Sequence, residues 1–369
     1  MTSTSNNSVW TPAESVVLVS HKDINLRAVD GKRPIDYGAW QISGWAARAA
    51  NGDLLAMTNL IEPYCMAVVS SRDNGRTWTK PRPVWTNPRP KEFNAYVFGL
   101  KVLSSGRILA GINLQHQNPL DPGNPIFALY SDDHGNTWNE GQHANYKPFV
   151  TAFTPASIVE DSDGSLLMPI DGVLEEPKGR QTNLWLVQSG ATGFVRSRDQ
   201  GISWGETLIA LGPDLRLGYY PSEPAYVCPP SGPWIMLVRL RTLEPAFLAR
   251  SVSQDRGRSW STPQLIGGDM ANHGLLLLPD GGILETGMGS GGLKLRVSYD
   301  GGFTWLYEMP LEPSGDVAMS GLVLDESTVF LVYGSATGDP YHFPNGMPKG
   351  AYYYSGLRGR WVRKLYAAL

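Results

Sequence analysis

Residues 71–78 of the chain read SRDNGRTW, and four variants of these eight residues follow at irregular spacing. The variants are SDDHGNTW at 131–138, SRDQGISW at 197–204, SQDRGRSW at 253–260 and SYDGGFTW at 298–305. All five obey the pattern S-x-D-x-G-x-[ST]-W. A repeated unit with variable spacing indicates a fold assembled from similar supersecondary units that are joined by loops of different length.

Each box has the chemistry of a tight turn. A short Asp side chain accepts hydrogen bonds from backbone N–H groups nearby, and the Gly two positions later suits a backbone with positive φ. The Trp at the end buries a large apolar surface. Alternating, strand-like text such as IFALYS at 126–131 precedes each box. The box therefore predicts the turn of a β-hairpin.

A second hairpin lies upstream of each box. Its turns read ANGD at 50–53, SSGR at 104–107, DSDG at 161–164, PPSGP at 229–233 and LPDGG at 278–282. Two hairpins make a four-stranded unit, and such units repeated around an axis are the blades of a β-propeller.

The two ends of the chain complete this pattern. Residues 317–334 form a sixth unit without a box, with a turn at 325–327, and residues 351–366 suggest a further hairpin. The early strand ESVVLVS at 14–20 has no blade of its own. We expect it to pair with the last blade and close the ring, because closure removes exposed strand edges.

Composition agrees with one all-β domain over residues 1–369, in which residues 1–13 are expected to be flexible. The chain has 41 glycines and 28 prolines, and only 18% of its residues are charged. A net charge of −3 argues against nucleic-acid binding. No apolar run is long enough for a bilayer, so no membrane partner is expected. No leader is visible, which favours a cytoplasmic protein, or a secreted one if a leader has been removed.

Motifs for cofactors and metals are not found. The sequence holds no His-x-x-x-His pair, no EF-hand loop and no phosphate-binding G-x-x-x-x-G-K-[ST] segment. Its two cysteines, Cys65 and Cys228, are interpreted as buried thiols, with a bridge as the minority alternative. The sequence therefore predicts neither a cofactor nor a metal.

Five boxes on a four-strand pattern resemble the Asp-box (BNR) repeats of the sialidase superfamily, whose members are six-bladed propellers. The resemblance covers nearly the whole chain and implies an all-β fold of six four-stranded antiparallel blades. In that family the boxes lie on the outer rim, away from substrate. The resemblance therefore implies a structural role for the box aspartates, which are Asp73, Asp133, Asp199, Asp255 and Asp300.

The segment SEPAYVCPPSGPWIMLVR at 222–239 resembles the sialidase segment that carries a catalytic Glu and one arginine of a carboxylate-binding triad. By this resemblance Glu223 acts as a base or orients a nucleophile, and Arg239 binds a substrate carboxylate bidentately. The alternative interpretation is a Glu–Arg ion pair that braces the central channel.

Other marks of the family are missing. The first inner strand, WQISGWAAR at 40–48, lacks the Phe/Tyr-Arg-Ile-Pro motif. Ser290 stands where the third arginine is expected, Met319 stands in place of the nucleophilic tyrosine, and Gly334 replaces a glutamate. Conventional retaining sialidase chemistry depends on that tyrosine and is therefore not expected.

Several polar side chains are predicted to face the axis instead. The candidate catalytic residues are Glu223, His116, His273, Asp171 and Tyr341. The candidate substrate-binding residues are Arg239, Arg241, Tyr96, Asn113, Glu62 and Gln41. A histidine with an ordinary pKa suits general acid–base catalysis near neutral pH.

The leading hypothesis is an exo-acting glycoside hydrolase of the sialidase-like superfamily, whose partner is a glycan with an acidic sugar. One alternative is a lyase that cleaves at a uronic acid by β-elimination, with an Arg that neutralises the carboxylate and a His or Tyr that moves the proton. A non-catalytic, carbohydrate-binding propeller is the other alternative.

Overall fold

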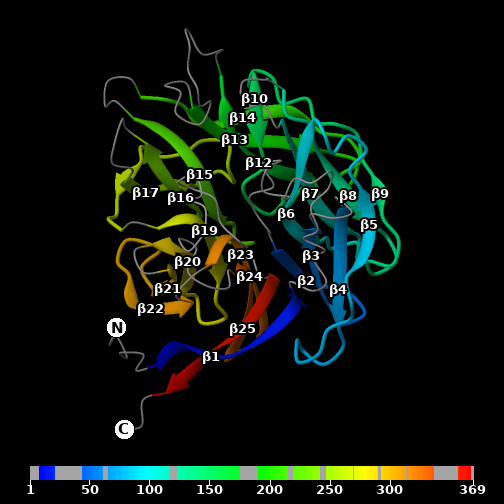
Figure 1. The fold of residues 1–369 in the computed structure, drawn as a ribbon. Helices are drawn as coiled ribbons and strands as arrows, with labels where there is room; N and C mark the ends of the chain where they lie inside the picture. Colours follow the sequence, from blue (N-terminus) through cyan, green and yellow to red (C-terminus); the bar gives the residue numbers. More distant parts are fainter. Residues whose placement is uncertain are drawn as a thin grey trace, which may run out of the picture.

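The structure is a computed structural model. It describes residues 8–20, 44–60, 65–116, 123–174, 190–214, 219–241, 247–268, 270–289, 292–312, 315–335 and 356–366. The described residues form six antiparallel β-sheets arranged as the blades of a propeller, and they include no helix (Figure 1). In these ranges, accordingly, no helix is long and apolar enough to cross a membrane.

The blades follow one another in chain order. Blade 1 contains β2 (Gly44–Arg48), β3 (Leu54–Leu60), β4 (Cys65–Ser71) and β5 (Arg82–Thr86). Blade 2 contains β6 (Phe93–Val102), β7 (Ile108–His116), β8 (Ile126–Ser131) and β9 (Asn139–Glu140). Blade 3 contains β10 (Thr151–Phe153), β11 (Val159–Glu160), β12 (Leu166–Val173), β13 (Gly190–Ser197) and β14 (Gly205–Leu211). Its first strand is interrupted, because β10 and β11 both pair with β12.

The second half of the ring repeats this order. Blade 4 contains β15 (Tyr220–Val227), β16 (Trp234–Arg241), β17 (Phe247–Ser253) and β18 (Gln264–Leu265). Blade 5 contains β19 (Ala271–Leu277), β20 (Ile283–Gly289), β21 (Gly292–Ser298) and β22 (Leu306–Glu312). Blade 6 contains β23 (Gly315–Asp325), β24 (Thr328–Ser335), β25 (Gly356–Tyr366) and β1 (Ser8–Ser20). The predicted six-bladed propeller is confirmed.

Strand β1 closes the ring, as expected. It pairs antiparallel with β25, and the two strands lie side by side in Figure 1. Of residues 1–13, which were expected to be flexible, residues 8–13 belong to β1, and Trp10 is fully buried in the core shared by blades 5 and 6. Residues 356–366 form one strand rather than a hairpin, and residues 351–355 lie outside the described residues.

The five boxes form the turns between the third and fourth strands of blades 1 to 5. In the first box, Asp73 Oδ1 accepts hydrogen bonds from Ser71 Oγ and from the Thr77 N–H, both at 2.8 Å. The Thr77 hydroxyl donates to Oδ2 at 2.6 Å. These hydrogen bonds lower the pKa of Asp73 to about 2, and the bond from the Thr77 hydroxyl has the largest effect. The Trp78 indole donates to the Gly75 carbonyl at 2.8 Å.

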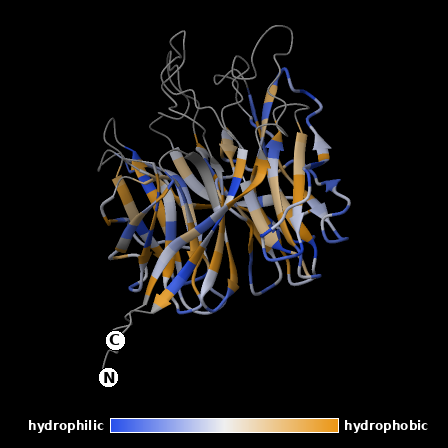
Figure 2. Cartoon of the chain, turned by 60° about the horizontal axis from the view of Figure 1, so that its bottom comes forward, coloured by the Kyte–Doolittle hydropathy of each residue, from blue (hydrophilic) through white to orange (hydrophobic). Residues whose placement is uncertain are grey.

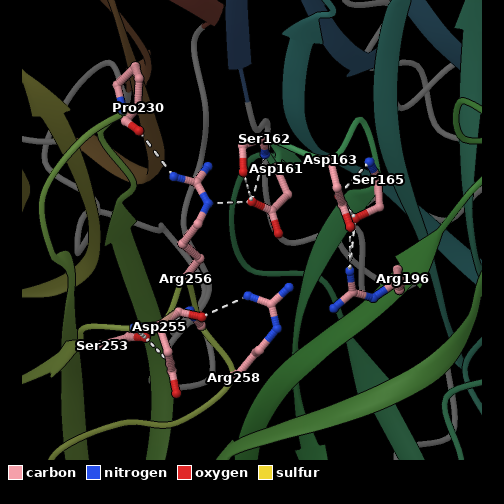
Figure 3. A network of polar contacts seen from close by, with 11 residues as sticks. Asp161, Ser162, Asp163, Ser165, Arg196, Pro230, Ser253, Asp255, Arg256 and Arg258 are labelled. Carbon is pink, nitrogen blue, oxygen red and sulfur yellow. Dashed lines mark hydrogen bonds and ion pairs between the residues drawn. The ribbon is translucent and has the colours of Figure 1, made fainter.

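Boxes also connect neighbouring blades. A Cβ at Gly201, in the third box, would lie 2.8 Å from Leu109 Cδ1 in blade 2. In the fourth box, Arg256 donates to the Asp161 carboxylate in blade 3 and to the Pro230 carbonyl, the latter at 3.0 Å (Figure 3). The box is therefore a turn motif and an interblade contact, in agreement with its expected structural role.

Apolar residues concentrate in the strands of the blades (Figure 2). Around the axis the first strands enclose a cavity of about 250 Å³ that all six blades line. Its walls include Trp45, Lys101, Glu160, Tyr226, His273 and Ser320. In each blade the first strand begins, and the second strand ends, on the face opposite the box turns, because the strands are antiparallel. Of the candidate site residues, His273 lines this cavity.

Candidate active site at the propeller axis

Glu223 occupies an irregular position in β15. The register between β15 and β16 shifts between Ser222 and Ala225, which marks a β-bulge, and Glu223 has a φ of 50°. A positive φ is uncommon outside glycine, and such residues concentrate at functional sites. A bulge re-aims the side chain that it carries. Here it accompanies a carboxylate that lies against two arginines.

Arg239 and Arg241 both bind this carboxylate. Arg239 Nη1 donates to both oxygens of Glu223 at 2.8 Å, and Arg241 Nη2 donates to Oε1. Alternation along β16 puts these two arginines on one side of the strand, and Arg239 is directly opposite Ser222 in β15. Arg241 Nε also donates to Ser222 Oγ at 2.7 Å.

The Glu223 cluster is partly open to solvent. The side chains of Glu223, Arg239 and Arg241 are 17%, 23% and 19% exposed. Two guanidiniums share one carboxylate, so these three side chains carry one net positive charge. A partly desolvated site with excess positive charge favours an anionic ligand.

Asp171 lies beneath Glu223 at the end of β12. Its Oδ2 accepts the backbone N–H of Glu223 at 2.6 Å, and the residue is only 4% exposed. Burial raises the pKa of Asp171 to about 8, and the negative charge of Glu223 adds to the rise, whereas the Glu223 N–H and the charge of Arg241 oppose it. Asp171 is therefore mainly protonated at neutral pH.

His273 connects Glu223 to a buried ion pair in blade 5. Its Nε2 lies 2.8 Å from the carbonyl oxygen of Glu223, and its Nδ1 lies 3.0 Å from Glu285 Oε1. Arg296 Nε donates to Glu285 Oε2 at 2.6 Å. The side chains of His273 and Glu285 are fully buried, and that of Arg296 is nearly so.

The structure thus brings five of the predicted residues together, namely Glu223, Asp171, His273, Arg239 and Arg241. They come from blades 3, 4 and 5. Three others lie in blade 2: Tyr96 and Asn113 are buried cross-strand partners in β6 and β7, and His116 ends β7 with its ring 4.4 Å from that of Phe93. Gln41, Glu62 and Tyr341 lie outside the described residues.

Three residues complete the network without being among the candidate catalytic and substrate-binding residues: Ser222, Glu285 and Arg296. Ser222 precedes Glu223 and holds Arg241, whereas Arg296 is the cross-strand neighbour of Glu285. The alternation of LKLRVS points Arg296 to the same side of the sheet as Glu285 and could have indicated the pair. Among the described ranges, no group of three or more His, Cys, Asp or Glu side chains is placed to hold a metal ion.

Solved structures share this architecture at low sequence identity. A protein of unknown function from Dyadobacter fermentans has a TM-score of 0.70 and 15% identity over 96% of this chain and 99% of that one. An α-L-arabinanase from Penicillium chrysogenum, complexed with arabinobiose, has a TM-score of 0.67 and 16% identity over 97% and 100%. A Hadza microbial sialidase has a TM-score of 0.60 and 17% identity over 89% and 66%.

These similarities establish the fold, and they confirm the resemblance to sialidase-like propellers. A search of curated protein sequences found no match. The model of the BNR repeat-like domain matches residues 66–305, which include all five boxes and the whole Glu223 cluster. Because this match spans more than half of the sequence, the chain belongs to the BNR repeat-like domain family.

Proposed function

We propose that this protein is a glycoside hydrolase that acts at the end of a glycan and recognises an acidic sugar. One observation carries the proposal: the Glu223 carboxylate and two guanidiniums form a partly exposed cluster with excess positive charge at the propeller axis. A carboxylate of this kind supplies the base or nucleophile that glycoside hydrolysis needs.

Arg239 is the residue that binds the sugar carboxylate. It contacts Glu223 through Nη1, and none of the described residues accepts a hydrogen bond from its Nε or Nη2. These two N–H groups form the edge of a guanidinium that binds a carboxylate bidentately. Arg241 is held by Ser222 and Glu223, and it adds positive charge to the same site.

In this proposal Glu223 activates water or attacks the anomeric carbon. Asp171 keeps its proton at neutral pH, so it places no second negative charge beside Glu223. His116, at the corresponding end of β7, is the candidate among the described residues for protonating the leaving oxygen. The hydrolytic class is supported by the arabinanase and the sialidase that share the fold.

The test is a panel of oligosaccharides with neutral, sialic or uronic acid ends, in which released sugar and unsaturated product are both measured. We expect sugar release without an unsaturated product, and only from acidic ends. Arg239→Ala should lower kcat/KM by about 10²-fold, because truncating one partner of a buried charged contact costs roughly 2–5 kcal/mol.

Arg258→Ala is the matched control, because Arg258 belongs to a box turn on the opposite face and should leave turnover unchanged. An unsaturated product would establish the lyase instead of the hydrolase. Saturable binding without turnover would establish a carbohydrate-binding propeller. Wild-type turnover by Arg239→Ala would show that the acidic group is bound elsewhere.

A further inference from the structure

The backbone of Glu223 needs outside support. Its left-handed φ of 50° lies inside a bulge, where the regular pairing of β15 with β16 is interrupted between Ser222 and Ala225. The following residue, Pro224, has no N–H to offer to the sheet. A residue in such a backbone conformation persists only when the surrounding structure determines it.

Two buried side chains from the neighbouring blades supply that support. Asp171, from β12 of blade 3, accepts the Glu223 N–H at 2.6 Å. His273, from β19 of blade 5, contacts the Glu223 carbonyl oxygen at 2.8 Å. The N–H and the carbonyl of Glu223 are therefore each bound by an ionisable side chain. One of these residues lies 52 positions before Glu223 in the sequence, and the other lies 50 positions after it.

The hydrogen-bond partners of His273 define its form. The carbonyl oxygen of Glu223 can only accept a hydrogen bond. The same is true of the Glu285 carboxylate, whose other oxygen already accepts a hydrogen bond from Arg296. A neutral imidazole offers a single N–H and can satisfy one of these acceptors. Both contacts are satisfied when the ring carries a proton on each nitrogen.

Asp171 complements this arrangement from the other side. A buried carboxyl that keeps its proton can still accept the Glu223 N–H, and it brings no like charge next to the Glu223 carboxylate. The two contacts on the Glu223 backbone, here called the Glu223 clamp, thus combine a neutral acceptor with an imidazole donor. The Glu223 side chain itself contacts Arg239 and Arg241.

We propose that Asp171 and His273 are positioning residues, which bind the N–H and the carbonyl of Glu223 and so fix its carboxylate between Arg239 and Arg241. This inference rests on the proposed function for its catalytic consequence. Its structural content, a doubly protonated His273 and a clamped Glu223 backbone, is independent of any substrate.

Matched pairs of variants separate positioning from chemistry. Asp171→Asn and His273→Gln keep an acceptor and a donor at the two positions, whereas Asp171→Leu and His273→Leu remove them. On the substrate found in the panel, we expect the leucine variants to lose about 10²-fold in kcat with little change in KM, because a misplaced group is costly to the reaction step. The Asn and Gln variants should stay within about threefold of wild type.

Equal losses in Asp171→Asn and Asp171→Leu would overturn the positioning role, because they would show that the carboxylic acid itself reacts. A wild-type kcat in Asp171→Leu or in His273→Leu would likewise overturn the positioning role of the residue that was replaced. These outcomes require turnover, so a second measurement is made without substrate.

Ring ¹⁵N chemical shifts of His273 in the intact wild-type protein report its protonation directly. We expect two protonated nitrogens at neutral pH, and an amide proton of Glu223 far downfield of the others in β15 because of its short bond to Asp171. A singly protonated ring, or an ordinary Glu223 amide shift, would refute the clamp even if the protein hydrolyses glycans. If the expected chemical shifts are found but the protein hydrolyses no glycan, the clamp is established and only the proposed function is refuted.

Discussion

Asp171 shows how burial changes the behaviour of a single residue. Its carboxyl group is placed among strands of blades 3 and 4, and burial raises its pKa to about 8. An aspartate in an unfolded chain has a pKa of about 3.9. The folded protein therefore holds a proton that the unfolded chain has released over much of the range between about pH 4 and pH 8.

This difference predicts a pH-dependent stability. The unfolded state binds fewer protons than the folded state in that range, so the contribution of Asp171 to the free energy of unfolding falls as pH rises. It is fully present below about pH 4 and is lost as pH rises through about 8. The slope is at most about 1.4 kcal/mol per pH unit.

Urea unfolding of wild type and Asp171→Asn at several pH values measures this contribution. The stability of the wild type relative to the variant should decrease from pH 5 to pH 8, because asparagine does not titrate. A difference that stays constant over this range would mean that Asp171 is ionised throughout.

At the scale of elements, the boxes determine how blades pack. Gly201 has a φ of 87°, and a Cβ there would approach both Leu109 methyl carbons, at 2.8 and 2.9 Å. Leu109 is fully buried in blade 2 and has little space to withdraw. Glycine is therefore required at this position both by its backbone conformation and by the contact with the preceding blade.

Gly201→Ala should destabilise the protein by roughly 2–4 kcal/mol, through left-handed strain of about 1–2 kcal/mol and overpacking of a similar size. Gly52→Ala is the matched control, because Gly52 has a similar φ of 92° and no neighbour within 4 Å of the added Cβ. We expect this control to show only the strain. Equal unfolding free energies for the two variants, measured in urea, would exclude the interblade contact as a source of stability.

At the scale of the whole molecule, the ring is closed by non-covalent pairing of its two ends. Strand β1 supplies the outermost strand of blade 6, and Trp10 in this strand is buried in the apolar cluster that includes Leu284, Val329 and Val362. Its indole N–H donates to Asp280 in blade 5 at 3.3 Å. The closing strand therefore joins the last two blades as well as the two ends of the chain.

Trp10→Ala should lower the free energy of unfolding by about 3–5 kcal/mol, as expected for loss of a buried tryptophan. Amide exchange in β25 should increase more than exchange in β12, which belongs to blade 3 on the opposite side of the ring. Val17→Ala is a suitable control, because Val17 belongs to the same strand and is 48% exposed. Uniform acceleration of exchange in all blades would contradict a local role in closure.

The architecture could be predicted from the sequence because its signals are local. A box such as 71–78 contains every donor and acceptor of its own turn, so five boxes and the hairpins before them indicate four-stranded blades and their order. These features depend on residues a few positions apart. Glu223 and Arg239 were identified by the resemblance of residues 222–239 to a sialidase segment, and Arg241 by analogy with axis-facing positions of that fold.

The environment of Glu223 was decided by the tertiary structure. Asp171 and His273 reach its backbone from other blades, across 52 and 50 residues of sequence, and the bulge that exposes this backbone has no sequence motif of its own. The raised pKa of Asp171 likewise depends on how completely neighbouring strands exclude water. Local hydrogen bonding therefore determined the blades, whereas burial and contacts between blades determined the chemistry at their axis.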